Sequence, residues 1–155
     1  MESALAQLEQ SGLATWIRES GVLYGYPLIL FLHTLALSTV VGLSSAIDLR
    51  LLGVASSIPL ASLEKTFSLV WAGFALTTAT GILLFMADAT KHASNPAFYV
   101  KLVFVGGGVA TVALVRRRVF HGRRRGAVLA AASLGCWLVA LGAGRLMAYI
   151  SEFVS

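Results

Sequence analysis

The chain has 155 residues, of which 57% are hydrophobic and only 12% are charged, and its formal net charge is +5. Soluble domains usually carry about 25% charged residues, so the composition excludes an ordinary soluble domain and indicates one integral membrane domain over residues 1–155. The positive charge does not predict nucleic-acid binding, because six of the twelve basic residues lie in one short block, RRRVFHGRRR, between two apolar segments.

Residues 1–20 predict an amphipathic helix that lies in the membrane interface, with its apolar side chains in lipid and its polar ones in water. The expected lipid-facing residues are Leu5, Leu8, Trp16 and Ile17. The pair Ser11-Gly12 is the expected break in this helix. The opening sequence MESALAQLEQ has neither a basic region nor an apolar stretch, so we expect no cleavable signal peptide.

Four later segments reach the length of about 20 apolar residues that a membrane-spanning helix needs. They cover about residues 26–49, 66–87, 97–115 and 127–150. Only helices and closed barrels satisfy all backbone polar groups in lipid. Because the connections are short, the sequence predicts an all-α fold: an integral membrane four-helix bundle preceded by the amphipathic interfacial helix.

The distribution of lysine and arginine predicts the orientation of the bundle. The connection from Arg116 to Arg125 carries the densest positive charge, so we expect it to be cytoplasmic and to contact anionic lipid head groups. Both termini and the loop with Lys91 and His92 then lie outside. The predicted topology is N-out and C-out; together with the resemblance to bacterial proteins given below, we expect a multi-pass protein of the bacterial inner (plasma) membrane.

Small residues recur at every fourth position in the first two spans, which lets helix backbones approach closely. The two stripes are Ser38, Gly42 and Ala46, and Gly73, Thr77 and Gly81. We expect them to pack within the chain, while contacts with a second protomer or a membrane partner stay open. At 100° per residue, the first stripe lies roughly opposite His33, whose face is therefore also expected to point into protein.

His33 is the most informative residue, because it lies inside the unbroken apolar segment 28–47. A full charge at that depth costs roughly 2.5 kcal/mol or more, so an intramembrane ionisable residue is by default a functional-site hypothesis. The predicted topology places His33 in the outer half of the membrane, where ionisable residues of the other spans are also expected. These residues are Asp88, His92, Lys101 and Arg145.

Two chemistries fit this outer group of residues. The first is a haem b site, in which His33 is the metal ligand, Lys101 and Arg145 hold propionates, and Lys101 or His92 completes or tunes the site. The second is a proton or ion relay that uses His33 with Asp88 or Lys101. Copper fits less well, because soft-metal sites usually need several Cys, Met or His ligands.

Two further features have both structural and functional interpretations. Gly106-Gly107-Gly108 weakens a helix by roughly 1 kcal/mol per glycine in water, so it serves either helix packing or the close approach of a flat ligand beside Lys101. Asp48 and Arg50 are two apart and cannot face each other on a helix. We therefore expect Asp48 to pair with an arginine of the 116–118 group as a structural clamp, while a role in transport or partner docking stays open.

Three segments, HTLALSTVVGLSSAIDLRLLG, TTATGILLF and NPAFYVKLVFV, resemble in this order a group of bacterial four-span membrane proteins. The group includes the copper-resistance D-type proteins and the membrane-bound four-helix protoporphyrinogen oxidase, and the DLRLLG ending is most similar to an uncharacterised member family. The resemblance covers about residues 26–115. In the oxidase, a first-span histidine and a lysine that opens the third span are needed for function, with haem b bound. By motif these residues correspond to His33 and Lys101.

The chain also departs from the oxidase pattern. It adds the arginine block and the N-terminal helix, and it lacks the aromatic-rich, proline-containing stretch after the histidine. The resemblance therefore implies the fold and a haem-type site more than the oxidase reaction. Our leading hypothesis is a b-type haem protein of membrane redox or porphyrin metabolism. The alternatives are a non-enzymatic accessory or assembly subunit of a larger membrane complex and a small ion or metal permease component. Whether the protein is an enzyme stays open.

Overall fold

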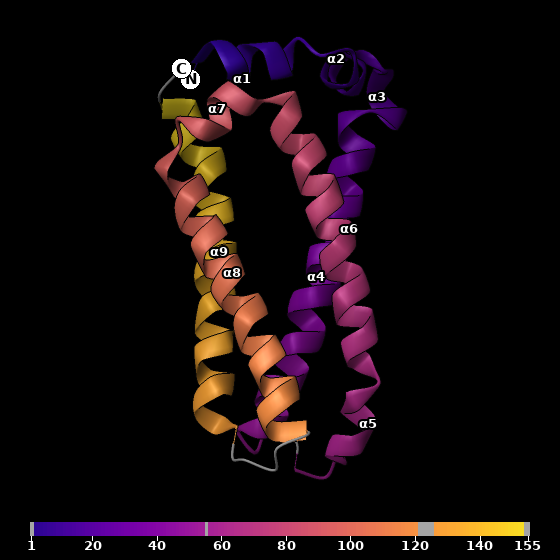
Figure 1. The fold of residues 1–155 in the computed structure, drawn as a ribbon, viewed down its shortest axis with the longest axis vertical. Helices are drawn as coiled ribbons and strands as arrows, with labels where there is room; N and C mark the ends of the chain where they lie inside the picture. The colour runs from indigo at the N-terminus through magenta and orange to yellow at the C-terminus, as the bar shows by residue number, and fades with distance from the viewer. Residues whose placement is uncertain (1, 55, 121–125, 154–155) are drawn as a thin grey trace.

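The structure is a computed structural model that describes residues 2–54, 56–120 and 126–153. The regular structure of these residues is helical, without a strand (Figure 1). In chain order the helices are α1 (Glu2–Glu9), α2 (Gly12–Glu19), α3 (Gly21–Tyr24), α4 (Tyr26–Leu51), α5 (Leu60–Glu64), α6 (Thr66–Ala87), α7 (Ala89–Ala93), α8 (Pro96–Val115), the π-helical η1 (Arg116–Phe120) and α9 (Ala127–Phe153).

The four predicted spans are confirmed as helices α4, α6, α8 and α9, each long and apolar enough to cross a membrane. The chain is thus an all-α helical bundle and a multi-pass membrane protein. Local chemistry sets where α8 begins: the Asn95 side chain accepts a hydrogen bond of 3.0 Å from the Ala97 amide, and Pro96 occupies the first turn, where no amide donor is needed.

The long helices form two antiparallel pairs, α4 with α6 and α8 with α9, and α4 also contacts α9. Figure 1 shows both pairs, which lie further apart at the end of the bundle that carries α1, α2 and α7 than at the end that carries α5. These two ends are called the α1 end and the α5 end below.

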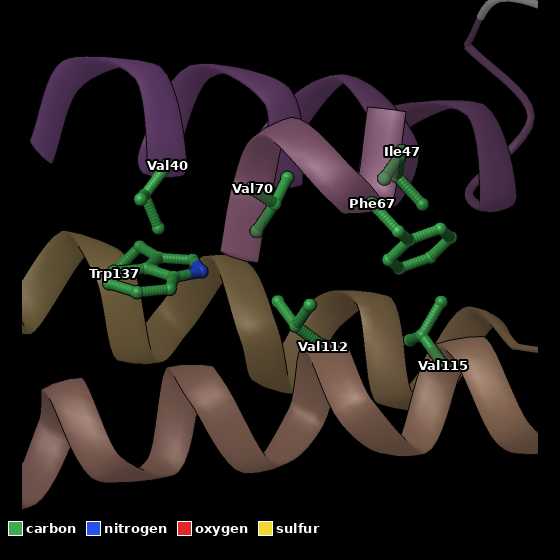
Figure 2. Close-up of a cluster of buried hydrophobic side chains, with 7 residues drawn as sticks. All are labelled: Val40, Ile47, Phe67, Val70, Val112, Val115 and Trp137. Carbon is green, nitrogen blue, oxygen red and sulfur yellow. The ribbon is translucent and has the colours of Figure 1, made fainter. Parts of the chain in front are cut away.

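A four-helix apolar core fills the half of the bundle towards the α5 end. Its buried side chains come from all four long helices and are Val40, Ile47, Phe67, Val70, Val112, Val115 and Trp137 (Figure 2). Large apolar side chains on the outside are exposed, among them Phe31, Val103 and Leu138. A bundle with an apolar exterior is suited to lipid rather than water.

The small-residue stripes behave differently on the two helices. On α6, a Cβ added at Gly73 would lie 3.0 Å from Cγ2 of Val40, so this stripe packs against α4 as predicted. On α4, Ser38, Gly42 and Ala46 are exposed, and nothing lies within 4 Å of a Cβ added at Gly42. The prediction that the α4 stripe packs within the chain is therefore wrong, because α4 turns its opposite face towards α6.

The N-terminal helices lie across the α1 end of the bundle rather than only along a lipid surface (Figure 1). Ile17 of α2 is 1% exposed and joins Ile29, Leu84 and Ala87 in a second apolar cluster. The expectation that Ile17 faces lipid is therefore wrong, whereas Trp16 is 54% exposed, as expected. The predicted break is present, since Ser11 caps α2 through its side chain.

Charged side chains attach α1 and α2 to the junction of α6 and α7. The Arg18 guanidinium donates hydrogen bonds of 2.8 Å to the Ala87 carbonyl and 2.7 Å to the Glu9 carbonyl. The Glu9 carboxylate in turn accepts a 2.7 Å hydrogen bond from the Thr90 amide. Arg18 thus satisfies a free carbonyl at the end of α6, and Glu9 satisfies a free amide at the start of α7. We call α1 and α2 together the cover.

Candidate functional site

His33 lies on the face of α4 that packs against α6, in the half of the bundle nearer the α1 end. Its side chain is half-buried. A Cβ added at Gly81 would lie 3.1 Å from Cε1 and 3.6 Å from Nδ1 of the His33 imidazole. The imidazole therefore rests directly on the α6 backbone, and the small-residue stripe of α6 provides the space for it. The prediction that the His33 face points into protein is confirmed.

The hydrogen bonds around His33 assign its tautomer. His33 Nδ1 lies 2.9 Å from Thr80 Oγ1, which itself lies 2.7 Å from the Leu76 carbonyl. A threonine hydroxyl has one proton, and only that proton can make the bond to the carbonyl. Thr80 Oγ1 must then accept, so His33 Nδ1 carries a proton and donates it. Nε2 of the neutral ring keeps its lone pair, free to bind a proton or a metal ion.

Lys101 of α8 reaches inwards from the opposite helix pair. Its side chain is half-buried and crosses the backbone of α9, where a Cβ added at Gly144 would lie 3.9 Å from Cδ and 4.0 Å from Cε of Lys101. Lys101 near the start of α8 and His33 on α4 both lie in the half of the bundle nearer the α1 end, one on each helix pair (Figure 1).

Arg145 and His92 are placed away from the contact between His33 and Thr80. Arg145 follows Gly144 on α9, but its side chain is exposed, about 100° round the helix from the residue that Lys101 crosses. His92 lies in α7, where Nδ1 is 2.8 Å from the Asp88 carbonyl and the ring packs edge-on against Phe85 and Phe98. The predicted roles of Arg145 and His92 stay predictions.

The donor set at His33 provides a single imidazole nitrogen for a metal. Among the described residues, no group of three or more His, Cys, Asp or Glu side chains is placed to share a metal ion. One histidine can nevertheless serve as the axial ligand of a haem iron, and metal-bound histidines usually donate their other N–H to an oxygen, as His33 does to Thr80. Among the described residues, His33 is therefore the one side chain of this site that offers a ligand atom to a haem iron.

The two apolar clusters of the bundle differ in which helices they join. The four-helix core lies towards the α5 end, whereas the second cluster draws its buried residues from α2, α4 and α6 alone. At the level of His33, the α8–α9 pair thus contributes no buried residue to an apolar cluster. Gly108 does not provide space for a ligand, because the Trp137 indole fills it. Gly107 and Gly108 serve helix packing against Cys136 and Trp137 of α9, whereas nothing lies within 4 Å of a Cβ added at Gly106.

A second polar group lies between α4 and α9, and the sequence does not predict it. Ser44 and Asp48 on α4 and Ser133 and Trp137 on α9 are each 2% exposed or less. The atoms Ser44 Oγ, Asp48 Oδ2, Ser133 Oγ and Trp137 Nε1 are all buried without a hydrogen-bond partner among the described residues. We call these four residues the interior polar row.

The predicted clamp between Asp48 and the arginines 116–118 is wrong for the described structure. Arg116, Arg117 and Arg118 are exposed, and the Arg116 guanidinium lies over the Phe67 ring, 5.8 Å from its centroid. The π-helical turn of η1 directs these side chains outwards, while Asp48 turns towards α9. His121 and the arginines at 123–125 lie outside the described residues, as does the predicted lipid contact of that part of the loop.

Sequence reasoning missed Thr80, Glu9 and Arg18 as residues that hold the site and its cover. Thr80 sits beside the Gly73–Gly81 stripe, and a hydroxyl on the same helix face as those glycines could have identified it as a partner for a buried histidine. No local pattern marks Glu9 and Arg18, because their partners lie 81 and 69 residues away. Comparisons of the chain with family models, with curated proteins and with solved structures give no match.

Proposed function

We propose that this multi-pass membrane protein binds haem b through Nε2 of His33 and takes part in membrane redox or porphyrin metabolism. The observation that carries the proposal is the hydrogen bond from His33 Nδ1 to Thr80, whose own proton is committed to the Leu76 carbonyl. This arrangement fixes the ring orientation and leaves Nε2 as a ligand atom. Such outer hydrogen bonds orient metal-binding histidines and raise their basicity.

Lys101 supports the same proposal from the other side of the bundle. Because Gly144 offers no side chain, the Lys101 alkyl chain lies against α9, and Lys101 is half-buried. A cation held in this way pairs well with a carboxylate such as a haem propionate, through a charge-assisted hydrogen bond. Arg145 is the weaker candidate for a second propionate, since it is exposed. When bound, haem supplies one-electron chemistry that protein side chains lack.

The absorption spectrum of the purified protein tests this proposal. The protein would be extracted from native membranes and, separately, from cells grown with added haem. We expect a Soret band in the original chain and in Thr34→Ala, and its loss in His33→Ala. Thr34→Ala is the control, because it changes an exposed residue next to His33 that has no predicted role in the site. A colourless original chain in both preparations, or an unchanged band in His33→Ala, would refute the proposal.

One observation favours a second candidate function, a non-enzymatic accessory or assembly subunit of a larger membrane complex. The stripe of Ser38, Gly42 and Ala46 on α4 has no partner helix within the described chain, and such stripes are typical of helix–helix contacts in membranes. Stoichiometric membrane partners that co-purify with a colourless chain, and that are lost in Gly42→Leu, would favour this function over haem binding.

A further inference from the structure

Asp48 is the most deeply buried acidic residue among those described. It lies one turn before the end of α4, and it is 2% exposed. The Ser133 hydroxyl of α9 lies beside its carboxyl group, yet Asp48 Oδ2 and Ser133 Oγ do not complete a well-formed hydrogen bond. A buried polar atom without a partner costs about 1–3 kcal/mol, and more if it is charged. The position therefore requires an explanation.

The way in which α4 and α9 lie alongside each other places the four residues of the interior polar row one after another. Figure 2 shows Val40 directly over the Trp137 ring, with the indole nitrogen on the side of the ring that faces the α5 end. Ser44 and Asp48 follow Val40 at steps of four residues, so these residues share one face of α4. Ser133 precedes Trp137 by four residues, so these two residues share one face of α9. The two helices are antiparallel, and these two faces lie towards each other. The row thus leads from Trp137 through the two serines to Asp48.

No described cation balances a negative charge on Asp48. On its own helix, the Arg50 guanidinium donates to the Ile58 carbonyl. On η1, Arg116 lies over the Phe67 ring, and Lys65, just before α6, is exposed. The nearest parts of α6, α8 and α9 contribute Phe67, Val115 and Ala130, which are apolar and buried. An ionised carboxylate in such surroundings is strongly disfavoured.

The side chains of the row also argue against a bound metal cation. Three unpartnered oxygen atoms are available, Asp48 Oδ2 and the two serine Oγ atoms, and the fourth member of the row, Trp137 Nε1, is a hydrogen-bond donor that cannot bind a cation. A hydrogen bond between Asp48 and Ser133 can form with either group as the donor, so geometry alone does not settle the protonation. Among the residues that the structure describes, no cation lies beside Asp48, and this favours the neutral acid.

We propose that Asp48 holds a proton in the folded protein, so that Ser44, Asp48 and Ser133 form a buried proton-binding site between α4 and α9. The neutral carboxyl group donates its proton to Ser133 Oγ and satisfies two of the unpartnered atoms at once. Because Asp48 lies near the end of α4, protons reach it from the aqueous phase at the α5 end. This site is separate from His33, which lies on the other side of the apolar residues Val40 and Trp137.

Isotope labelling can single out Asp48 in an infrared spectrum, because Asp48 and Asp88 are the only aspartates in the sequence. The protein would be made by cell-free synthesis with aspartate labelled with ¹³C at the side-chain carboxyl, in the Asp88→Asn variant, so that Asp48 is the only labelled acid. Infrared difference spectra between labelled and unlabelled protein at neutral pH would show its protonation state. We expect a carboxylic-acid C=O band that shifts in D₂O. If Asp88→Asn does not fold, the labelled original chain would be compared with labelled Asp48→Asn, so that the band lost in the variant belongs to Asp48.

Two controls complete the experiment. Ser133→Ala should move the Asp48 band to higher frequency, because the acid loses its hydrogen-bond acceptor, whereas Ser68→Ala, an exposed serine, should leave it unchanged. Carboxylate bands alone at neutral pH would overturn the proposal. It would also be overturned if adding sodium or lithium chloride at constant pH converted the acid band to a carboxylate band, since that result would identify a metal-cation site.

Discussion

The Trp137 indole lies against Gly108 so closely that a Cβ added at Gly108 would come within 2.8 Å of Trp137 Cε2. The two residues join α8 to α9 at the edge of the four-helix core, where Trp137 is 2% exposed. The Trp137 ring therefore occupies the space that a side chain at Gly108 would need. A substitution at either residue disturbs the packing unless the other residue is changed as well.

Gly108→Ala should destabilise the folded protein by about 1–3 kcal/mol, because the added methyl group overpacks a filled core. Gly106→Ala is the matched control on the same helix, since nothing lies within 4 Å of its added Cβ. The control should be neutral or stabilising by about 0.5–1 kcal/mol, from the better helix propensity of alanine. Thermal unfolding in detergent measures both variants. Equal effects at the two positions would show that Gly108 and Trp137 do not pack as described.

Thr80→Val should weaken haem binding about 10–100-fold, because the valine methyl group cannot accept the hydrogen bond from His33 Nδ1. Thr80→Ser keeps the hydroxyl and should bind haem nearly as well as the original chain. Titration of the apoprotein with haem, followed at the Soret band, measures the affinities. If valine and serine behave alike, the Thr80 hydroxyl does not position His33.

Lys101→Met should lower the reduction potential of bound haem, since it removes a positive charge that stabilises the added electron while keeping an unbranched chain over Gly144. Arg145→Met removes the same charge from an exposed position, where solvent screens it, so its effect should be smaller. Potentiometric titration of the pigment compares the variants. A larger shift for Arg145→Met would mean that Arg145, rather than Lys101, is the cation beside the haem.

Arg18→Ala should loosen the cover, because it removes the hydrogen bonds to the Ala87 and Glu9 carbonyls. A loss of about 1 kcal/mol for these two hydrogen bonds, one part-buried and one exposed, corresponds to roughly fivefold faster amide exchange in α1 and α2. Hydrogen–deuterium exchange with mass spectrometry resolves these segments. Arg117→Ala, at an exposed residue of η1, should leave them unchanged. Unchanged exchange in Arg18→Ala would show that the cover is held by apolar contacts alone.

Ile17→Ala should release the cover more completely, at a cost of about 2–4 kcal/mol for a buried isoleucine. Leu13→Ala on the same helix is the control, because Leu13 is 48% exposed. Limited proteolysis between α2 and α4 reports the difference, with Ile17→Ala cleaved first. Faster cleavage of Leu13→Ala would contradict the orientation of α2.

The sequence predicted the four spans well because their signal is a property of each segment alone. A run of about 20 apolar residues must be helical in lipid, and the start of α8 follows from Asn95 and Pro96. The His33 face was also predictable, since an imidazole avoids lipid. The cover, α5, α7 and η1 were harder, because short helices depend on contacts such as the one between Glu9 and Thr90 that join distant parts of the chain.

The predictions that failed share one physical reason. A stripe of small residues shows that a helix face can approach another helix closely, but it does not show which helix lies there. In this structure the stripe on α6 packs against α4, whereas the stripe on α4 is exposed. In the same way, helical spacing correctly separated Asp48 from Arg50 but could not choose between α9 and the arginines as its neighbour. Choosing a partner requires the relative rotation of the helices, which packing of the whole bundle determines.

The pairing of consecutive spans has a consequence for how the chain assembles. Helices α4 and α6, and then α8 and α9, pack with their neighbours in sequence, so each pair can form as soon as its two spans have entered the membrane. The contact of α4 with α9 joins the first span to the last and can form only when synthesis is nearly complete. Asp48 and Ser133 lie on that contact, so their burial belongs to the final step of folding, when the two hairpins close on each other.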